Sequence, residues 1–128
     1  MFSWEIAKYM DKPIETLNVI ESNPIKAKVF APVAFPDRDR FGARFEGWAF
    51  DRQTGRPPKH VVVTNSAGQI QGLARFTSSR KNVATRFDLD PETRLAFGGY
   101  IKDYVESETY IFYVILNDGL SAVRLPDP

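Results

Sequence analysis

The chain contains no cysteine and a single histidine, and both scarcities limit the chemistry open to it. Without cysteine there are no disulfides, no thiolate nucleophiles and no cysteine-ligated zinc. The one histidine, His60, cannot supply the several ligands that zinc needs, and no nucleophile-elbow sequence is present to form a triad with it. We therefore expect no metal and no cofactor, and we interpret His60 as a structural, half-exposed residue at the start of a strand.

Long apolar runs and a surplus of one charge are also absent. No window approaches the roughly 18 consecutive apolar residues of a membrane span. Glu5 and Lys8 interrupt the first ten residues, which is not the pattern of a signal peptide. The 17 basic and 16 acidic residues leave a net charge of +1. This balance argues against nucleic acid as a partner, since domains that bind its phosphates usually carry a lopsided basic surface.

What is present is enough apolar sequence for one domain. The chain has 128 residues, of which 43% are hydrophobic, and a chain of this size can bury a core without disulfides or metals. At its start, Phe2, Ile6 and either Tyr9 or Met10 fall on one helical face. We divide the chain into residues 1–22, a short N-terminal helix with a linker or a fragment of a longer chain, and residues 23–128, a single β domain.

Short alternating segments between turn residues indicate antiparallel β-structure. The clearest unit is a meander of three strands, over residues 44–50, 59–65 and 69–76. Four further strands are expected over residues 26–35, 100–105, 109–116 and 120–125. The segment 109–116 is apolar on both faces, as a strand covered on both sides is. About seven short strands predict a mainly β fold, either an antiparallel β-sandwich or an open barrel.

The pattern changes after residue 77, where we expect a short helical insertion between two strands. Ser78 or Ser79 can cap a helical turn in which Val83 and Phe87 share a face. Asp90-Pro91 is a second helix start signal, with Asp at the cap and Pro at the first helical position. Both helices are expected to be short.

Several acidic groups match motifs of glycan-processing enzymes. Asp37-Arg38-Asp39 has the acid-x-acid form found in metal-dependent glycosyltransferases, but the chain is too short and too β-rich for their nucleotide-binding domain. Glu46 with Asp51, or Glu106 with Glu108, has the residue types of a glycosidase pair. Acidic residues alternating along strands are usually solvated, and we read the first motif as a charged turn. We therefore expect no enzymatic activity.

Aromatic rings are the stronger candidates for binding, because sugar rings stack on exposed tyrosine and tryptophan. Tyr100 and Tyr104 share one side of a predicted strand and are expected to form an exposed strip. Arg56 and Arg80 have the chemistry to hold an acidic sugar or a phosphate, with salt bridging inside the domain as the alternative. Trp48 lies in an apolar strand and is expected in the core.

A series of short motifs follows in a characteristic order. The motifs are Gly47-Trp48-Ala49-Phe50-Asp51, Gly55-Arg56-Pro57-Pro58, Val61-Val62-Val63, Ser79-Arg80-Lys81-Asn82-Val83-Ala84 and Gly99-Tyr100. This order resembles the small β-sandwich module at the ends of bacterial polytopic membrane proteins of the glycosyltransferase type, and of some other cell-envelope glycan proteins. The chain departs from that pattern at Arg80-Lys81-Asn82, where the module has Arg-Pro-Asp, so an amide stands in place of a carboxylate.

The resemblance implies a non-catalytic, extracytoplasmic accessory module. Such a module binds glycan or packs against a membrane-embedded parent or partner protein. A cytoplasmic or structural assembly domain is the second reading, and a small glycan-acting enzyme the third. The motif residues to which we assign structural roles are Gly47, Trp48, Asp51, Gly55, Asn82 and Gly99.

Overall fold

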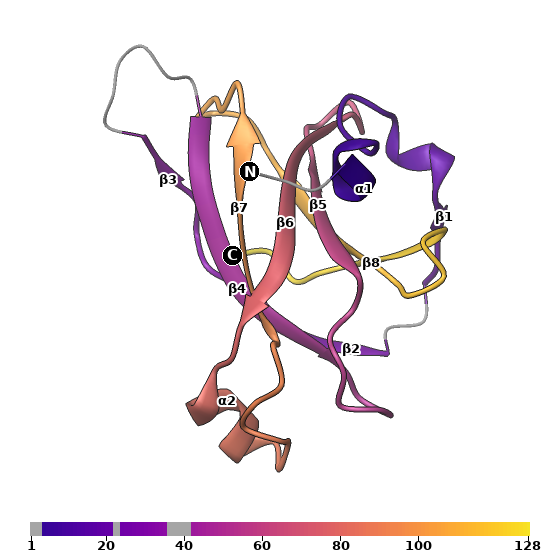
Figure 1. Ribbon diagram of the computed structural model, residues 1–128. Coiled ribbons are helices and arrows are strands. Elements are labelled where there is room, and N and C mark those ends of the chain that lie inside the picture. Colours follow the sequence, from indigo (N-terminus) through magenta and orange to yellow (C-terminus); the bar gives the residue numbers. More distant parts are fainter. Residues whose placement is uncertain (1–3, 22–23, 36–41) are drawn as a thin grey trace.

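The strands join into one sheet that curls on itself (Figure 1). The structure is a computed structural model and describes residues 4–21, 24–35 and 42–128, so the predicted charged turn at Asp37-Arg38-Asp39 lies outside the described residues. The helices are α1 (Trp4–Ala7), the 3-10 helix η1 (Ile14–Thr16) and α2 (Lys81–Arg86). The strands are β1 (Asn18–Val19), β2 (Ile25–Val29), β3 (Val33–Ala34), β4 (Gly42–Asp51), β5 (His60–Thr64), β6 (Ile70–Ser78), β7 (Ala96–Lys102), β8 (Ile111–Ile115) and β9 (Ser121–Arg124).

The strand order across the sheet is β1-β9-β8-β5-β6-β7-β4-β2, and β3 also pairs with β4. Neighbouring strands are antiparallel, except that β1 runs parallel to β9. β2 and β3 pair with successive parts of β4, where a single strand was predicted over residues 26–35. Pro32 lies between them, and it has no N–H to donate to a strand ladder.

Alternation along the strands sends one set of apolar side chains to the inner, concave face of the sheet. Ile25 on β2 and Val123 on β9 belong to the same buried cluster, although their strands lie near opposite ends of the strand order. The curl therefore brings both ends of the sheet over one core. At its centre the Phe45 ring lies 5.4 Å from the ring of Phe112 and 6.1 Å from that of Phe97. Burying each such side chain is worth about 1.5–3 kcal/mol.

The N-terminal segment covers part of the outer, convex face. Its buried side chains are Ile6, Tyr9, Ile14 and Leu17. They pack on outward side chains of β5, β6, β8 and β9. Two backbone hydrogen bonds fasten the segment, from the Asp11 N–H to the Ile70 carbonyl at 2.9 Å and from the Ile70 N–H to the Lys12 carbonyl at 2.8 Å. Of the helix predicted for the first ten residues, the described part contains the single turn α1.

This cover explains why residues 109–116 are apolar on both faces. On β8, Phe112 and Val114 point into the inner core, whereas Tyr113 and Ile115 point into the cluster under the N-terminal segment. The prediction that this strand is buried on both sides is confirmed. It has partners on both edges as well, β5 and β9.

The helix α2 and the loop after it cover a second part of the outer face. Trp48 and Phe50, which point outward from β4, pack there against Val83, Ala84 and Leu95. Trp48 is only 4% exposed, and its ring stacks on the Phe50 ring at a centroid distance of 6.0 Å. The prediction that Trp48 is a core residue is confirmed.

The second predicted helix, which Asp90-Pro91 would have started, does not form. The Asp90 carboxylate accepts a hydrogen bond from the Glu92 N–H at 2.9 Å, and the Thr93 N–H donates to the Asp90 carbonyl at 3.0 Å. Both contacts close a turn, and β7 begins at Ala96, too soon for a helix to develop. The aspartate is therefore a turn residue, because the side-chain bond that caps helices also closes tight turns.

The structure has one curled sheet where a two-sheet sandwich was the first expectation, so the open-barrel alternative describes it. Two glycines on the inner face account for the tight curl. A Cβ at Gly99 would lie 1.9 Å from the Leu73 carbonyl oxygen, and one at Gly47 would lie 2.2 Å from the Lys28 carbonyl oxygen. With only hydrogen at these positions, neighbouring strands approach closely enough for one sheet to enclose the core.

Gly99→Ala should destabilise the fold, because the added methyl has no room against the backbone of β6. Overpacking of this kind costs about 1–3 kcal/mol of unfolding free energy, and backbone clashes lie at the upper end. The matched control is Gly98→Ala at the adjacent position, where a Cβ would meet nothing within 4 Å. Urea denaturation of the two variants measures the difference, and equal midpoints would contradict the role given to Gly99.

Candidate functional site

The two covers leave an open stretch of the outer face between them. There β4 and β7 pair so that Arg44 lies opposite Tyr100 and Glu46 lies opposite Gly98, and all four residues are exposed. Successive outward positions on a strand are about 7 Å apart. The two pairs therefore form neighbouring steps of one continuous surface.

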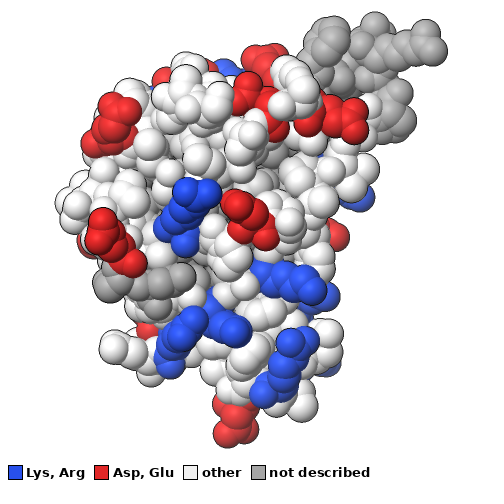
Figure 2. Space-filling model, turned by 180° about the vertical axis from the view of Figure 1, so that it is seen from behind, with Lys and Arg blue, Asp and Glu red and all other residues white. Residues whose placement is uncertain are grey.

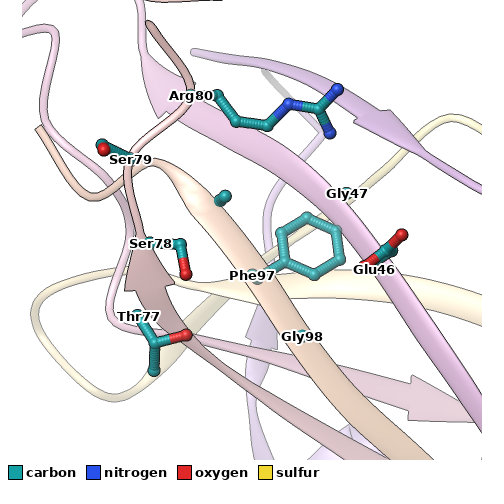
Figure 3. A pocket seen from close by; sticks show the side chains of 9 residues that line it. Glu46, Gly47, Thr77, Ser78, Ser79, Arg80, Phe97 and Gly98 are labelled. Carbon is teal, nitrogen blue, oxygen red and sulfur yellow. The ribbon is translucent and has the colours of Figure 1, made fainter. Parts of the chain in front are cut away.

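Two hollows lie on this surface, and we call them together the outer trough. The first has a volume of about 250 Å³ and is lined by Glu46, Gly47, Thr77, Ser78, Ser79, Arg80, Ala96, Phe97 and Gly98 (Figure 3). The second has a volume of about 220 Å³ and is lined by Val33, Ala34, Phe35, Arg44 and Tyr100. The trough thus has a polar end near Arg80 and an aromatic end at Tyr100.

Gly98 lies in the middle of the trough floor. A Cβ built there meets no atom within 4 Å, and its backbone does not adopt a positive φ. Neither packing nor backbone conformation therefore requires glycine at this position. Glycine weakens a strand interior, and it often marks a bulge, a tight bend, or a site that a ligand or another backbone approaches closely. The sequence analysis did not single out this residue.

Arg80 lies at the polar end, where its side chain extends toward β4 beside Gly47 (Figure 3). Its guanidinium carbon lies 5.3 Å from the centre of the Phe30 ring, and the Lys28 ammonium lies 5.5 Å from the same ring. Among the described residues Arg80 forms no ion pair, so the salt bridge considered as its alternative role is not made there. A cation–π contact orients the guanidinium without occupying its N–H donors.

Tyr100 lies at the aromatic end and is 47% exposed. Its ring centre is 5.6 Å from that of Phe35, at an interplanar angle of 34°. The two rings form a small aromatic surface beside the Arg44 side chain, which lines the same hollow. Such a surface suits a ligand that combines an apolar face with polar edges.

Tyr104 does not join Tyr100, so the predicted strip along one strand is wrong. β7 ends at Lys102, and Asp103 has a positive φ of 51°, which breaks the alternation before Tyr104 is reached. The Tyr104 ring instead stacks on Tyr110 at a centroid distance of 5.2 Å and packs against the inner core cluster. The outer trough and Tyr104 therefore belong to opposite faces of the sheet.

Arg56 lies in the turn between β4 and β5 and lines neither hollow of the trough. The same turn shows the structural role expected for Asp51, whose carboxylate accepts hydrogen bonds from the N–H groups of Gln53 at 2.8 Å and Thr54 at 3.2 Å. Gly55 has a positive φ of 72°, which glycine adopts without strain. Asn82 is exposed on α2.

His60 is 8% exposed, so the half-exposed position predicted for it is wrong. Its ring meets that of Tyr9 edge-on at a centroid distance of 6.2 Å, and Tyr9 belongs to the N-terminal cover. The sequence around His60 does not indicate that the N-terminal segment, which is distant along the chain, packs over this residue. The structural interpretation of this histidine is unchanged.

Of the two carboxylate pairs considered for a glycosidase, Glu46 and Asp51 have separate surroundings. Glu46 lies in the trough, whereas Asp51 closes the turn described above. Glu108, in the loop between β7 and β8, accepts a hydrogen bond from the Ser66 N–H at 2.9 Å. Hydrogen bonds from the Ser66 side chain and backbone hold the pKa of Glu108 below its ordinary value. In the described parts of the chain, no group of three or more His, Asp or Glu residues could hold a metal ion.

Sequence reasoning did not identify several residues that line the trough, namely Phe35, Arg44, Thr77, Ser78 and Gly98. It considered Glu46 as a catalytic acid and not as a binding residue. A signal for part of this set was present in the chain. Arg44 and Glu46 alternate with buried residues on β4, and a pair of glycines follows in the strand beside it. The sequence does not show that the register between β4 and β7 places Glu46 opposite Gly98, whose position has room for a side chain.

The two tyrosines should respond differently to truncation. Tyr104→Ala removes a half-buried ring from the core and is expected to cost about 1–3 kcal/mol of unfolding free energy, below the range for a fully buried aromatic residue. Tyr100→Ala at the exposed end of the trough should stay within about 0.5 kcal/mol of the parent. Thermal or urea unfolding distinguishes them, and a larger loss for Tyr100 would show that its ring is part of the packing.

The described chain contains no helix long and apolar enough to cross a bilayer. Comparison with protein-family models, curated proteins and solved structures gives no match to this chain. The likeness to accessory modules of envelope glycosyltransferases stays a prediction from motifs such as Gly47-Trp48-Ala49-Phe50-Asp51.

Proposed function

We propose that the domain is a non-catalytic binding module and that its outer trough binds a glycan. The observation that carries the proposal is Gly98, an exposed glycine in the interior of β7 that neither packing nor backbone conformation requires. Because Gly98 has no side chain, a ligand on the floor of the trough could contact the backbone of β7 directly. A ligand lying along β7 would then reach both hollows at once.

The side chains around the trough suit a sugar. A sugar ring presents an apolar face, which stacks on aromatic rings, and a belt of hydroxyl groups that donate and accept hydrogen bonds. Tyr100 and Phe35 supply the rings, while Thr77, Ser78 and Glu46 supply hydroxyl and carboxylate groups. These partners are arranged along β7 in the order aromatic, open floor, polar, so that neighbouring sugar units would meet different surroundings.

The acid groups that line the trough among the described residues support binding without turnover. Among the described residues that line it, Glu46 is the one carboxylate. Hydrolysis of a glycosidic bond ordinarily uses two carboxyl groups on either side of the scissile bond. A single carboxylate beside hydroxyl groups can hydrogen-bond a sugar but lacks the second partner for acid–base chemistry.

The proposal places this module outside the cytoplasm, beside a membrane-embedded partner protein. Together with the motif order of the sequence, a glycan-binding trough supports an extracytoplasmic accessory module beside a membrane-embedded glycosyltransferase-type protein. The module would hold the glycan near the partner that processes it.

Gly98→Val is the direct test of the trough. Valine fills the open floor, yet it favours strand geometry, so the variant should melt at or above the parent temperature. We expect the parent to bind glycans on an array and Gly98→Val to lose at least tenfold in affinity, a change of about 1.4 kcal/mol. Arg124→Val, which places valine on the outer face of β9 away from the trough, is the matched control. Equal binding by all three proteins, or no binding by the parent, would overturn the proposal.

A packing surface is the second candidate function, and exposed apolar residues at the β1–β9 edge favour it. Leu120 is 68% exposed and Val19 is 43% exposed, and the Asn18 N–H bonds to the Leu120 carbonyl at 2.8 Å. A hollow of about 480 Å³ lies beside them, lined by Lys8, Tyr9, Lys12, Thr16, Leu17, Gly119 and Leu120. Exposed apolar patches of this kind mark contacts with protein or membrane.

Photo-crosslinking in the cell tests this second function. If the domain packs against a partner protein through this edge, a crosslinking amino acid at position 120 should give one discrete protein adduct. The same amino acid at position 98 should give none, because that position faces the trough. Absence of an adduct from position 120 would contradict the packing function.

A further inference from the structure

The outer trough carries a local excess of positive charge that the composition hides. Arg44 and Arg80 line it, Arg75 is paired with Gly98 from the β6 side, and Lys28 shares the Phe30 ring with Arg80. Among the described lining residues, Arg44 and Arg80 are basic and Glu46 is the one carboxylate, so two positive charges face one negative charge, and Arg75 and Lys28 add positive charge beside the hollows.

In the described part of the chain, none of Arg44, Arg75, Arg80 and Lys28 takes part in an ion pair. Charge is also unevenly distributed over one face of the molecule. Seen from behind, most basic side chains in view lie in the half of the molecule that carries α2, and the acidic ones lie mostly in the opposite half (Figure 2). Charge of one sign focused in a hollow attracts ligands of the other sign.

Two of these cations, Arg80 and Lys28, each contact the Phe30 ring. The Arg80 guanidinium carbon lies 5.3 Å from its centre and the Lys28 ammonium 5.5 Å. The ring attracts each cation through its face, but it does not remove their mutual repulsion. An anionic group that contacts both would remove that repulsion and would use the N–H donors that the ring leaves available.

Nucleic acid is a weaker match to this arrangement than an acidic sugar. Grooves for single-stranded nucleic acid track a repeating phosphate backbone and carry a succession of stacking rings. The trough has one aromatic end, and Glu46 and hydroxyl groups lie between that end and Arg80. A carboxylate there repels a phosphate at each step but accepts hydrogen bonds from sugar hydroxyls.

We propose that the glycan of the outer trough is acidic, with a uronate carboxylate or a phosphate substituent bound between Arg80 and Lys28 and a sugar ring on Tyr100. This inference rests on the proposed function and names the ligand class of the same site. The shared chemistry is an anionic group on a sugar, and separate probes distinguish the carboxylate from the phosphate.

The first experiment is an array that displays neutral, uronate-bearing and phosphate-bearing glycans, with inorganic phosphate and a single-stranded oligonucleotide as competitors. We expect binding only to glycans of one acidic class, weakened by salt because the contact is ionic. Equal binding to matched neutral glycans, lost in Gly98→Val, would overturn this inference but keep the proposed function. Stronger binding to the oligonucleotide would overturn both, and absence of any glycan binding would also overturn both.

The second experiment removes the cations singly. Arg80→Gln and Lys28→Gln should each weaken binding of the acidic glycan by about tenfold, the effect of losing one charge-assisted hydrogen bond. Each should leave binding of a neutral analogue, such as the methyl ester of the uronate, within about twofold. Arg94→Gln, an exposed arginine outside the trough, is the control and should change neither.

A third variant separates charge from shape at Arg80. Arg80→Lys keeps the positive charge but loses the planar fork, so it should retain salt dependence while binding more weakly than the parent. Unfolding curves check that every variant is folded. Loss of neutral and acidic binding in equal measure in Arg80→Gln would show that Arg80 supports the trough structurally, and would overturn the inference.

Discussion

The close approach of β7 to β6 and of β4 to β2 is the constraint on which the rest of the structure depends. Gly99 and Gly47 permit it, since a side chain at either position would run into the backbone of the next strand. Because these strands curve so tightly, a single sheet encloses its own core, and Ile25 and Val123 meet although they lie near opposite ends of the strand order. The curvature also gives the sheet a convex outer face, which the N-terminal segment and α2 cover only in part.

The two covers come from unrelated parts of the chain and protect different ends of that outer face. The N-terminal segment lies over β5, β6, β8 and β9, and α2 with its following loop lies over the Trp48 end of β4. Neither reaches the pairs formed by Arg44 with Tyr100 and by Glu46 with Gly98. The outer trough is thus the part of the sheet that lies between the two covers and that the described residues leave exposed.

Local chemistry could be predicted from the sequence, and long-range placement could not. The turn formed by Asp51 and Gly55, the burial of Trp48 and the two apolar faces of β8 each follow from residues a few positions apart. The errors concern contacts between distant segments. His60 is buried because Tyr9 lies over it, and Tyr104 turns to the inner core because Asp103 breaks the strand. Gly99 is required by the close approach of β6, whereas Gly98 has open space beside it. This difference depends on the strand register, which residues close in sequence do not reveal.

The parallel pairing of β1 with β9 has a mechanical consequence. The two strands are joined by the Asn18 N–H to the Leu120 carbonyl at 2.8 Å and by the Ile20 N–H to the Ala122 carbonyl at 2.9 Å. In a parallel pair, the chain enters β1 at one end and leaves β9 at the other. A pulling force through the two flanking chains would therefore load both bonds together, in shear along the strands, instead of opening them one after another. In a module tethered at both sides, tension would load the packed N-terminal segment first and then this edge in shear.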